Sequence, residues 1–92
     1  MIRVADIQRA VCEHYALDRD TLLSGNRTRK IAEPRQVGMY LAREHTRLSH
    51  RQIATLFKRA DHSTVCHAHQ KVARNWQAFS QDVEAIRQRL AA

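Results

Sequence analysis

The pattern that decides the fold lies in residues 49–77, which read SHRQIATLFKRADHSTVCHAHQKVARNWQ. Ser49 and Gln52 form a capping-box pair, so a helix is expected to start at His50. Its apolar side chains recur three and four residues apart and predict one buried face, made of Ile53, Leu56 and Phe57. We expect this short helix to end around residues 57–59.

A second helix is expected to follow Asp61, whose short polar side chain suits an N-cap. Its apolar face is expected at positions with helical spacing, namely Val65, His69, Val72 and Trp76. Two helices joined by a few residues, the second opening with short polar side chains, are typical of a helix-turn-helix. In such motifs the first residues of the second helix reach base edges in the major groove. An ordinary helical hairpin, in which Asp61 only caps and His62 is solvated, fits this stretch equally well.

The rest of the chain predicts an all-α fold of five or six short helices. No strand pattern or repeat interrupts it, so residues 1–92 are expected to form a single domain, with residues 77–92 as a C-terminal helical extension. Apolar spacing predicts a helix over residues 4–15. Asp18 suits the N-cap of a short helix that ends near Leu23.

A longer helix is expected to begin within a few residues of Pro34 and to run to about Thr46, because proline is favoured in a first helical turn. Its buried stripe is expected at Val37, Leu41 and His45, with Gly38 and Ala42 allowing close helix approach. Its remaining polar positions are expected on the solvent side: Arg35, Gln36 and Arg43. Residues 27–30 before it are expected to form a basic loop. Ser80 is expected to cap a last helix, whose apolar face would comprise Val83, Ile86 and Leu90.

The charge is concentrated in the middle of the chain. The chain carries 16 Lys and Arg against 9 Asp and Glu, a net charge of +7. Residues 27–59 hold nine of the basic and two of the acidic residues, so this third carries the whole excess. A concentrated basic field is expected for a polyanionic partner, nucleic acid first. A solvated basic face that only keeps the protein soluble is the alternative.

Other classes of function find little support in the sequence. Residues 61–69 hold three of the six histidines and one of the two cysteines, but no second ligand pair at zinc-finger spacing follows, and Cys12 is remote. No Gly-rich phosphate loop occurs, and Ser63 or Cys66 beside histidines on one helix makes no catalytic cleft. We therefore expect no enzyme activity, cofactor, metal or nucleotide. Without a signal peptide or a membrane-length apolar run, a cytoplasmic protein with reduced thiols and no membrane partner is expected.

Six short segments carry a family resemblance. They are Asp6-Ile7-Gln8 with Tyr15, Leu22-Leu23-Ser24, Arg27-Thr28-Arg29, Pro34-Arg35-Gln36, Leu41-Ala42-Arg43-Glu44 and Asp61-His62-Ser63-Thr64-Val65. Their order and spacing resemble the C-terminal DNA-binding domain (domain IV) of DnaA, the bacterial chromosomal replication initiator. The resemblance covers about residues 2–77 without an evident gap.

The resemblance implies a helix-turn-helix that reads the nine-base DnaA box in double-stranded DNA. It assigns Arg27 to the minor groove. It assigns phosphate contacts to Arg29, Lys30, Arg35, Gln36, Arg43 and Lys71, and major-groove base edges to Asp61, His62, Ser63 and Thr64. These residue types suit those roles, because arginine fits a narrow electronegative minor groove, arginine and glutamine bind phosphate oxygens, and short polar side chains fit base edges.

Three departures from the family pattern bear on box affinity and specificity. Residues 58–60, Lys-Arg-Ala, stand where the family usually has a glycine-containing turn and an arginine directly before Asp-His. Gly25 and Asn26 replace basic residues, and Glu33 stands before Pro34 where a basic residue is usual.

The family's ATP-binding domain has no counterpart in this chain. We therefore expect either an excised domain or a small stand-alone relative that modulates initiation. The first function implied is specific binding to DnaA-box-like sites, with a nucleoid-associated location. The alternative is regulation mainly through contact with full-length DnaA or its regulators, with weak or non-specific DNA binding.

Overall fold

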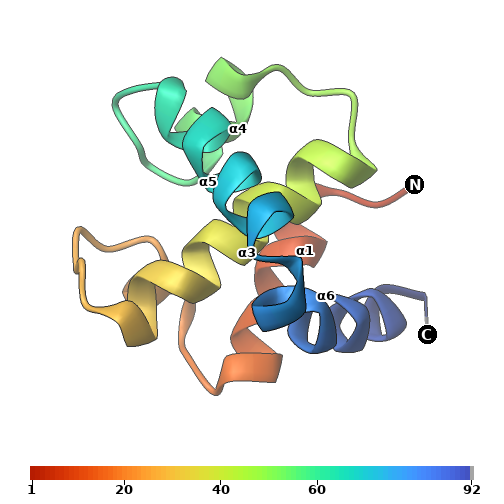
Figure 1. Ribbon diagram of the computed structural model, residues 1–92. Helices are drawn as coiled ribbons and strands as arrows, with labels where there is room; N and C mark the ends of the chain where they lie inside the picture. The colour runs from red at the N-terminus through yellow and green to blue at the C-terminus, as the bar shows by residue number, and fades with distance from the viewer. Residues whose placement is uncertain (92) are drawn as a thin grey trace.

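The computed structural model describes residues 1–91, and this part of the chain forms six helices joined by short loops (Figure 1). The helices are α1 (Val4–Tyr15), α2 (Arg19–Leu22), α3 (Arg29–His45), α4 (His50–Leu56), α5 (Ser63–Arg74) and α6 (Trp76–Ala91). No strand occurs in the described residues, so the all-α prediction is confirmed. Among these helices none has both the length and the apolar character needed to cross a membrane.

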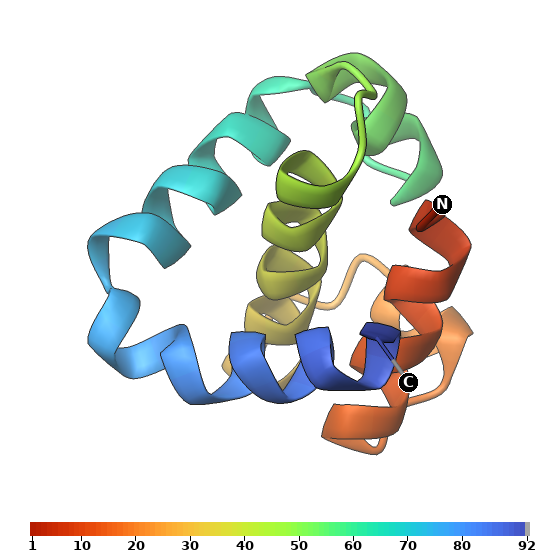
Figure 2. The ribbon, with the colours of Figure 1, turned by 90° about the vertical axis from the view of Figure 1, so that its right-hand side faces the viewer.

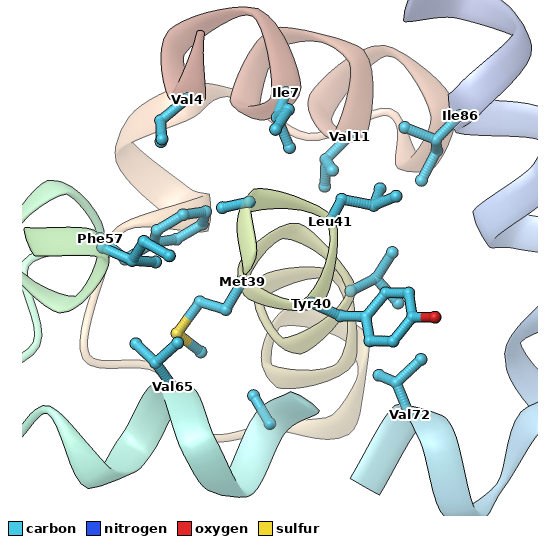
Figure 3. Packing of buried hydrophobic residues seen from close by; sticks show 14 of the residues in the cluster. Val4, Ile7, Val11, Met39, Tyr40, Leu41, Phe57, Val65, Val72 and Ile86 are labelled. Atoms are coloured by element: carbon cyan, nitrogen blue, oxygen red, sulfur yellow. The ribbon is translucent and has the colours of Figure 1, made fainter. Parts of the chain in front are cut away.

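Helix α3 stands at the centre, with α1, α5 and α6 around it and α4 near one end (Figure 2). Its second half explains this place, because residues 37–42, VGMYLA, are all buried. Figure 3 shows Val11 of α1 approaching α3 from one side and Val65 of α5 approaching it from the other. Each large apolar side chain buried in this way contributes about 1.5–3 kcal/mol. The core therefore holds α5 firmly against α3.

A close contact at Gly38 ties the helix-turn-helix to α3. A Cβ atom at Gly38 would lie 3.0 Å from Cε1 and 3.1 Å from Cζ of Phe57. Phe57 follows α4 directly and is fully buried. The missing side chain of Gly38 therefore leaves room for the phenyl ring, which confirms the close approach expected from the sequence.

The helix starts predicted from local residue pairs are confirmed. Ser49 Oγ accepts a hydrogen bond from the Gln52 amide at 3.1 Å, and Gln52 Oε1 accepts one from the Ser49 amide at 2.9 Å. Asp18 Oδ1 accepts the Thr21 amide at 2.7 Å and so caps α2. Helix α1 has the predicted bounds.

The expected start of the central helix is wrong for two residues, because Arg29 and Lys30 lie in the first turn of α3 rather than in a loop. The carbonyl of Thr28 accepts hydrogen bonds from the amides of Ile31 and Ala32, at 3.0 and 2.7 Å. These bonds open the helix before the proline, which lies inside it.

The last helix begins at Trp76, so the expectations that Ser80 caps it and that Trp76 belongs to the face of α5 are wrong. Asn75 makes the break between the two helices. Its side-chain amide donates to the carbonyl of Lys71 at 2.8 Å, which closes α5, and its own carbonyl accepts the Ala78 amide at 2.9 Å, which opens α6. The expected apolar face of α6 is confirmed at two fully buried residues, Val83 and Ile86.

Two apolar faces differ in detail from the prediction. Leu56 is 44% exposed, and Ala54 takes the buried place on α4. On α5, Ala68 is buried, whereas His69 is half-buried and its ring stacks on that of Tyr40 with centroids 4.9 Å apart.

Candidate nucleic-acid interface

A hollow of about 930 Å³ lies between the loop after α2, the first half of α3, the turn that joins α4 to α5, and α5 itself. Five basic side chains line it, namely Arg27, Arg35, Lys58, Arg59 and Lys71, and Asp61 is the one carboxylate. We call this the basic hollow. In Figure 1 the loop after α2 and the turn before α5 lie on the same, left-hand side of the molecule. The fold thus gathers charge from distant segments onto one surface, and six of the predicted DNA-binding residues line it: Arg27, Arg35, Gln36, Asp61, Thr64 and Lys71.

The start of α5 forms one wall of the basic hollow. Asp61 Oδ1 accepts a hydrogen bond from the Ser63 amide at 2.9 Å, and this bond lowers the pKa of the Asp61 carboxyl. The expectation that Asp61 is the N-cap of α5 is wrong, because His62 takes that position. The Asp61 carboxylate still satisfies a helix-terminal amide. His62 is exposed and outside the lining of the hollow, whereas Thr64 lies in that lining. The exposed side chains at this helix start are free to meet a ligand.

The loop of residues 23–28, which we call the 23–28 loop, carries Arg27 at the opposite wall. Short polar side chains shape this loop from within. Ser24 Oγ donates to the Thr21 carbonyl at 2.7 Å, and Asn26 Oδ1 accepts the Thr28 amide at 2.8 Å. Arg27 is exposed and lines the basic hollow. The predicted minor-groove residue therefore lies on an ordered loop that faces α5 across the hollow.

Arg35 is buried, at 5% exposure, so the prediction that it lies on the solvent side of α3 is wrong. Its Nε donates to the carbonyl of Leu22 at 2.8 Å, and its Nη2 donates to the carbonyl of Asn26 at 3.0 Å. Burial lowers the pKa of the guanidinium, and the nearby charge of Arg59 lowers this pKa further. Because its donors already bind loop carbonyls, Arg35 supports the 23–28 loop instead of extending toward solvent.

Arg59 plays a similar part from the other side, and the sequence patterns did not single it out as a site residue. Its Nη2 donates to the carbonyls of Leu23 and Ser24, both at 2.8 Å, and its Nε donates to the carbonyl of Phe57 at 3.0 Å. Lys58 and His67 also line the hollow without having been predicted. Two signals pointed to Lys58 and Arg59: their place in the basic middle third of the chain, and their departure from the family's usual glycine-containing turn. For His67 the signal was its position one helical turn after Thr64.

Three predicted phosphate-binding residues lie away from the basic hollow. Arg29 and Lys30 line a separate hollow beside Tyr15 and Asp82. Arg43 is exposed in another hollow, beside His50 and His69 on α4 and α5. The structure therefore splits the predicted phosphate contacts between surfaces, and only Arg43 among these three lies beside the helix-turn-helix.

Glu33 sits between two of the predicted phosphate contacts. Its Oε2 lies 4.0 Å from Lys71 Nζ and 3.6 Å from Arg29 Nε. The negative charge of Glu33 reduces the local field at Lys71, which lines the basic hollow. Glu33, which stands where the family usually has a basic residue, therefore weakens the positive field of Lys71 on α5.

One residue that lines the hollow has a buried polar atom without a hydrogen-bond partner within residues 1–91. Gln36 Oε1 is buried and has no partner in the described part of the chain. Buried polar atoms without partners are costly, so this oxygen is an unfavourable feature of the packing next to the hollow. In residues 1–91 no three His, Cys, Asp or Glu side chains come together as a metal site would require.

Comparison with known proteins identifies a family to which the chain is similar. The family described as "Bacterial dnaA protein helix-turn-helix" matches residues 4–72. The chromosomal replication initiator protein DnaA of Sphingopyxis alaskensis is 54% identical over 67 residues, which cover 73% of this chain and 15% of that protein. The protein of the same name from Mesorhizobium japonicum is 42% identical over 89 residues, covering 94% of this chain and 18% of its own length. That from Bartonella quintana is 48% identical over 71 residues, covering 77% and 14%.

Proposed function

Because the chain belongs to the bacterial DnaA helix-turn-helix family, we propose that it binds double-stranded DNA at DnaA-box-like sites and acts in chromosomal replication initiation or its control. The chain spans 15–18% of the length of the first two relatives, so the proposal concerns this binding module and not the activity of the whole initiator. A cytoplasmic, nucleoid-associated location follows from the proposal.

One observation carries the proposal: Arg27 and the start of α5 border the same basic hollow. A duplex that lies across this surface can present its minor groove to Arg27 and its major groove to residues 61–64. Thr64 offers a hydroxyl and a methyl group, which suit a base edge and the thymine methyl, and the Asp61 carboxylate suits the amino group of cytosine. In this arrangement Lys71 and Arg43, which are both exposed, bind the DNA phosphates.

Arg35 takes a different part in this proposal from the one assigned by resemblance. Its guanidinium supports the 23–28 loop, so it orders the surface rather than binding a phosphate itself. Gln36, which lines the hollow, keeps the phosphate contact assigned to it by resemblance.

A second function is favoured by Glu33. Its carboxylate neutralises part of the charge at Arg29 and Lys71 and would repel phosphate. The alternative is therefore a regulator that keeps the fold but acts mainly through contact with full-length DnaA or its regulators. Such a protein would bind DNA weakly and without preference for the box.

A titration separates the two functions. The protein is titrated at about 0.15 M salt against a duplex with the DnaA box and against a scrambled duplex, beside a pull-down with full-length DnaA. Non-specific contacts alone give Kd values of roughly 10⁻⁴ to 10⁻⁶ M. Box binding at about 10⁻⁶ M or tighter, with weaker binding to the scrambled duplex, supports the DNA reader. Equal weak binding to both duplexes together with a stable DnaA complex supports the regulator.

A further inference from the structure

The 23–28 loop is held from two directions by guanidinium groups. Four carbonyls within residues 22–26 accept hydrogen bonds from Arg35 or Arg59, and only that of Gly25 is left out. Arg35 comes from α3, whereas Arg59 comes from the turn that leads into α5. The loop therefore depends on side chains that lie at least nine residues away in sequence.

Arg59 is the link between the two walls of the basic hollow. It precedes Asp61 by two residues in the turn. Two of its hydrogen bonds, both at 2.8 Å, join that turn to the carbonyls of Leu23 and Ser24, and a third, to the carbonyl of Phe57 at 3.0 Å, holds the guanidinium against the turn itself. Hydrogen bonds from a charged donor are stronger than neutral ones and fix direction when the donor is a planar fork. Movement of the loop relative to α5 would break these bonds.

The two guanidinium groups have no acidic partner to neutralise them. Neither Arg35 nor Arg59 forms an ion pair with a carboxylate in the described part of the chain. Their like charges lie close enough that Arg59 lowers the pKa of Arg35. A polyanion over the hollow would relieve this repulsion, so the arrangement favours the surface on which phosphate would lie.

We propose that Arg59 is a positioning residue, which sets the 23–28 loop and Arg27 at a fixed place relative to the start of α5 so that both can engage one duplex. The inference rests on the proposed DNA binding. Pre-ordering the loop reduces the entropy lost on binding, since Arg27 need not be immobilised by the DNA alone. Arg59 thus raises box affinity through its hold on the loop, beyond the contribution of its charge.

Three variants separate position from charge. Arg59→Gln removes both the charge and the planar guanidinium. Arg59→Lys keeps the charge, but its ammonium group cannot reproduce the three hydrogen bonds of the guanidinium. Arg51→Gln removes one exposed charge on α4 and is the matched control. The first measurement is amide hydrogen exchange of residues 24–28 without DNA, with melting temperatures to confirm folding. We expect about tenfold faster exchange in both Arg59 variants and no change in Arg51→Gln. Unchanged exchange in both Arg59 variants overturns the proposal, and because no DNA is present this result is independent of the proposed function.

The second measurement is a double-mutant cycle on the box duplex. Arg27→Ala is compared in the wild-type and Arg59→Lys backgrounds. We expect Arg59→Lys to weaken box binding about tenfold while leaving scrambled-duplex binding nearly unchanged, and Arg27→Ala to cost less in that background. An equal cost of Arg27→Ala in both backgrounds contradicts the positioning role. If wild-type protein shows no box preference, the proposed function fails, and the exchange measurement alone supports or overturns the hold of Arg59 on the loop.

Discussion

Replacing Lys58 by glycine should stabilise the fold. Lys58 has a φ of 57°, in the left-handed region that residues with a Cβ atom adopt at a cost. It is exposed in the turn between α4 and α5, where its amide donates to the Thr55 carbonyl at 3.0 Å. Glycine keeps that amide and removes the steric conflict. Lys58→Gly therefore changes backbone strain without opening a cavity.

The size of the effect follows from two opposing contributions. Relief of the left-handed conformation is worth about 1–2 kcal/mol, while the greater freedom of glycine in the unfolded chain costs about 0.4–1 kcal/mol. The free energy of unfolding should rise by about 1 kcal/mol. For a domain of this size that corresponds to a rise in Tm of about 4–8 °C. Thermal and urea unfolding, each followed by circular dichroism in the absence of DNA, measure it.

Two matched substitutions make the result decisive. Ala16 has the same φ of 57° at the end of α1, so Ala16→Gly should also stabilise. Ala85 lies in the interior of α6, so Ala85→Gly should destabilise by about 1 kcal/mol because glycine is a poor helix former. A fall in Tm for Lys58→Gly comparable with that for Ala85→Gly would show that the left-handed conformation of Lys58 does not strain the backbone.

Three further predictions concern charged groups, two beside the basic hollow and one at the start of α2. Glu33→Gln should raise affinity for box and scrambled duplexes alike, by about 0.5–1 kcal/mol, because Lys71 loses its nearby carboxylate; an unchanged Kd on both would show that Glu33 does not weaken the interface. Ala60→Arg should raise box affinity, because Ala60 is exposed in the lining of the basic hollow and an arginine there would reach phosphate or a base edge; fluorescence anisotropy with the box duplex checks it. The hydrogen bond from the Thr21 amide lowers the pKa of Asp18 below its ordinary value of 3.8. The stabilising effect of the Asp18 carboxylate is therefore present above pH 3.8 and is lost as pH falls through the lower pKa of the folded state. Asp18→Asn should lose less stability than wild type between pH 5 and about 2.5, and parallel pH profiles of the two proteins would contradict this.

Local patterns were enough to predict much of the fold. The pairing of Ser49 with Gln52 and the cap at Asp18 involve residues three apart, so the sequence contains the whole interaction. The central helix was also expected, with close helix approach at Gly38, but the partner in that contact, Phe57, was not predicted. The break at Asn75 escaped prediction because Asn75 acts through its backbone carbonyl as well as its side chain.

The candidate site could be predicted only in part, because its support comes from distant residues. Arg35 has a polar side chain on an amphipathic helix, and periodicity alone places such a residue in solvent. Its acceptors are carbonyls 13 and 9 residues earlier in the chain, and the two acceptors of Arg59 in the 23–28 loop lie 36 and 35 residues earlier. Backbone carbonyls leave no mark in the sequence, so neither role could be derived without the fold.

If the start of α5 reads bases, removing an exposed side chain there should weaken binding to the box alone, and His62→Ala makes this change. His62 is exposed at the N-cap and accepts no cap hydrogen bond, so its truncation should leave the fold intact. Kd is measured for wild type, His62→Ala and the phosphate control Lys71→Ala, each on box and scrambled duplexes at the same salt concentration. We predict that His62→Ala loses about 1–3 kcal/mol on the box and little on the scrambled duplex, whereas Lys71→Ala weakens both alike. Equal losses for His62→Ala on the two duplexes, or none on either, would contradict base reading by this helix.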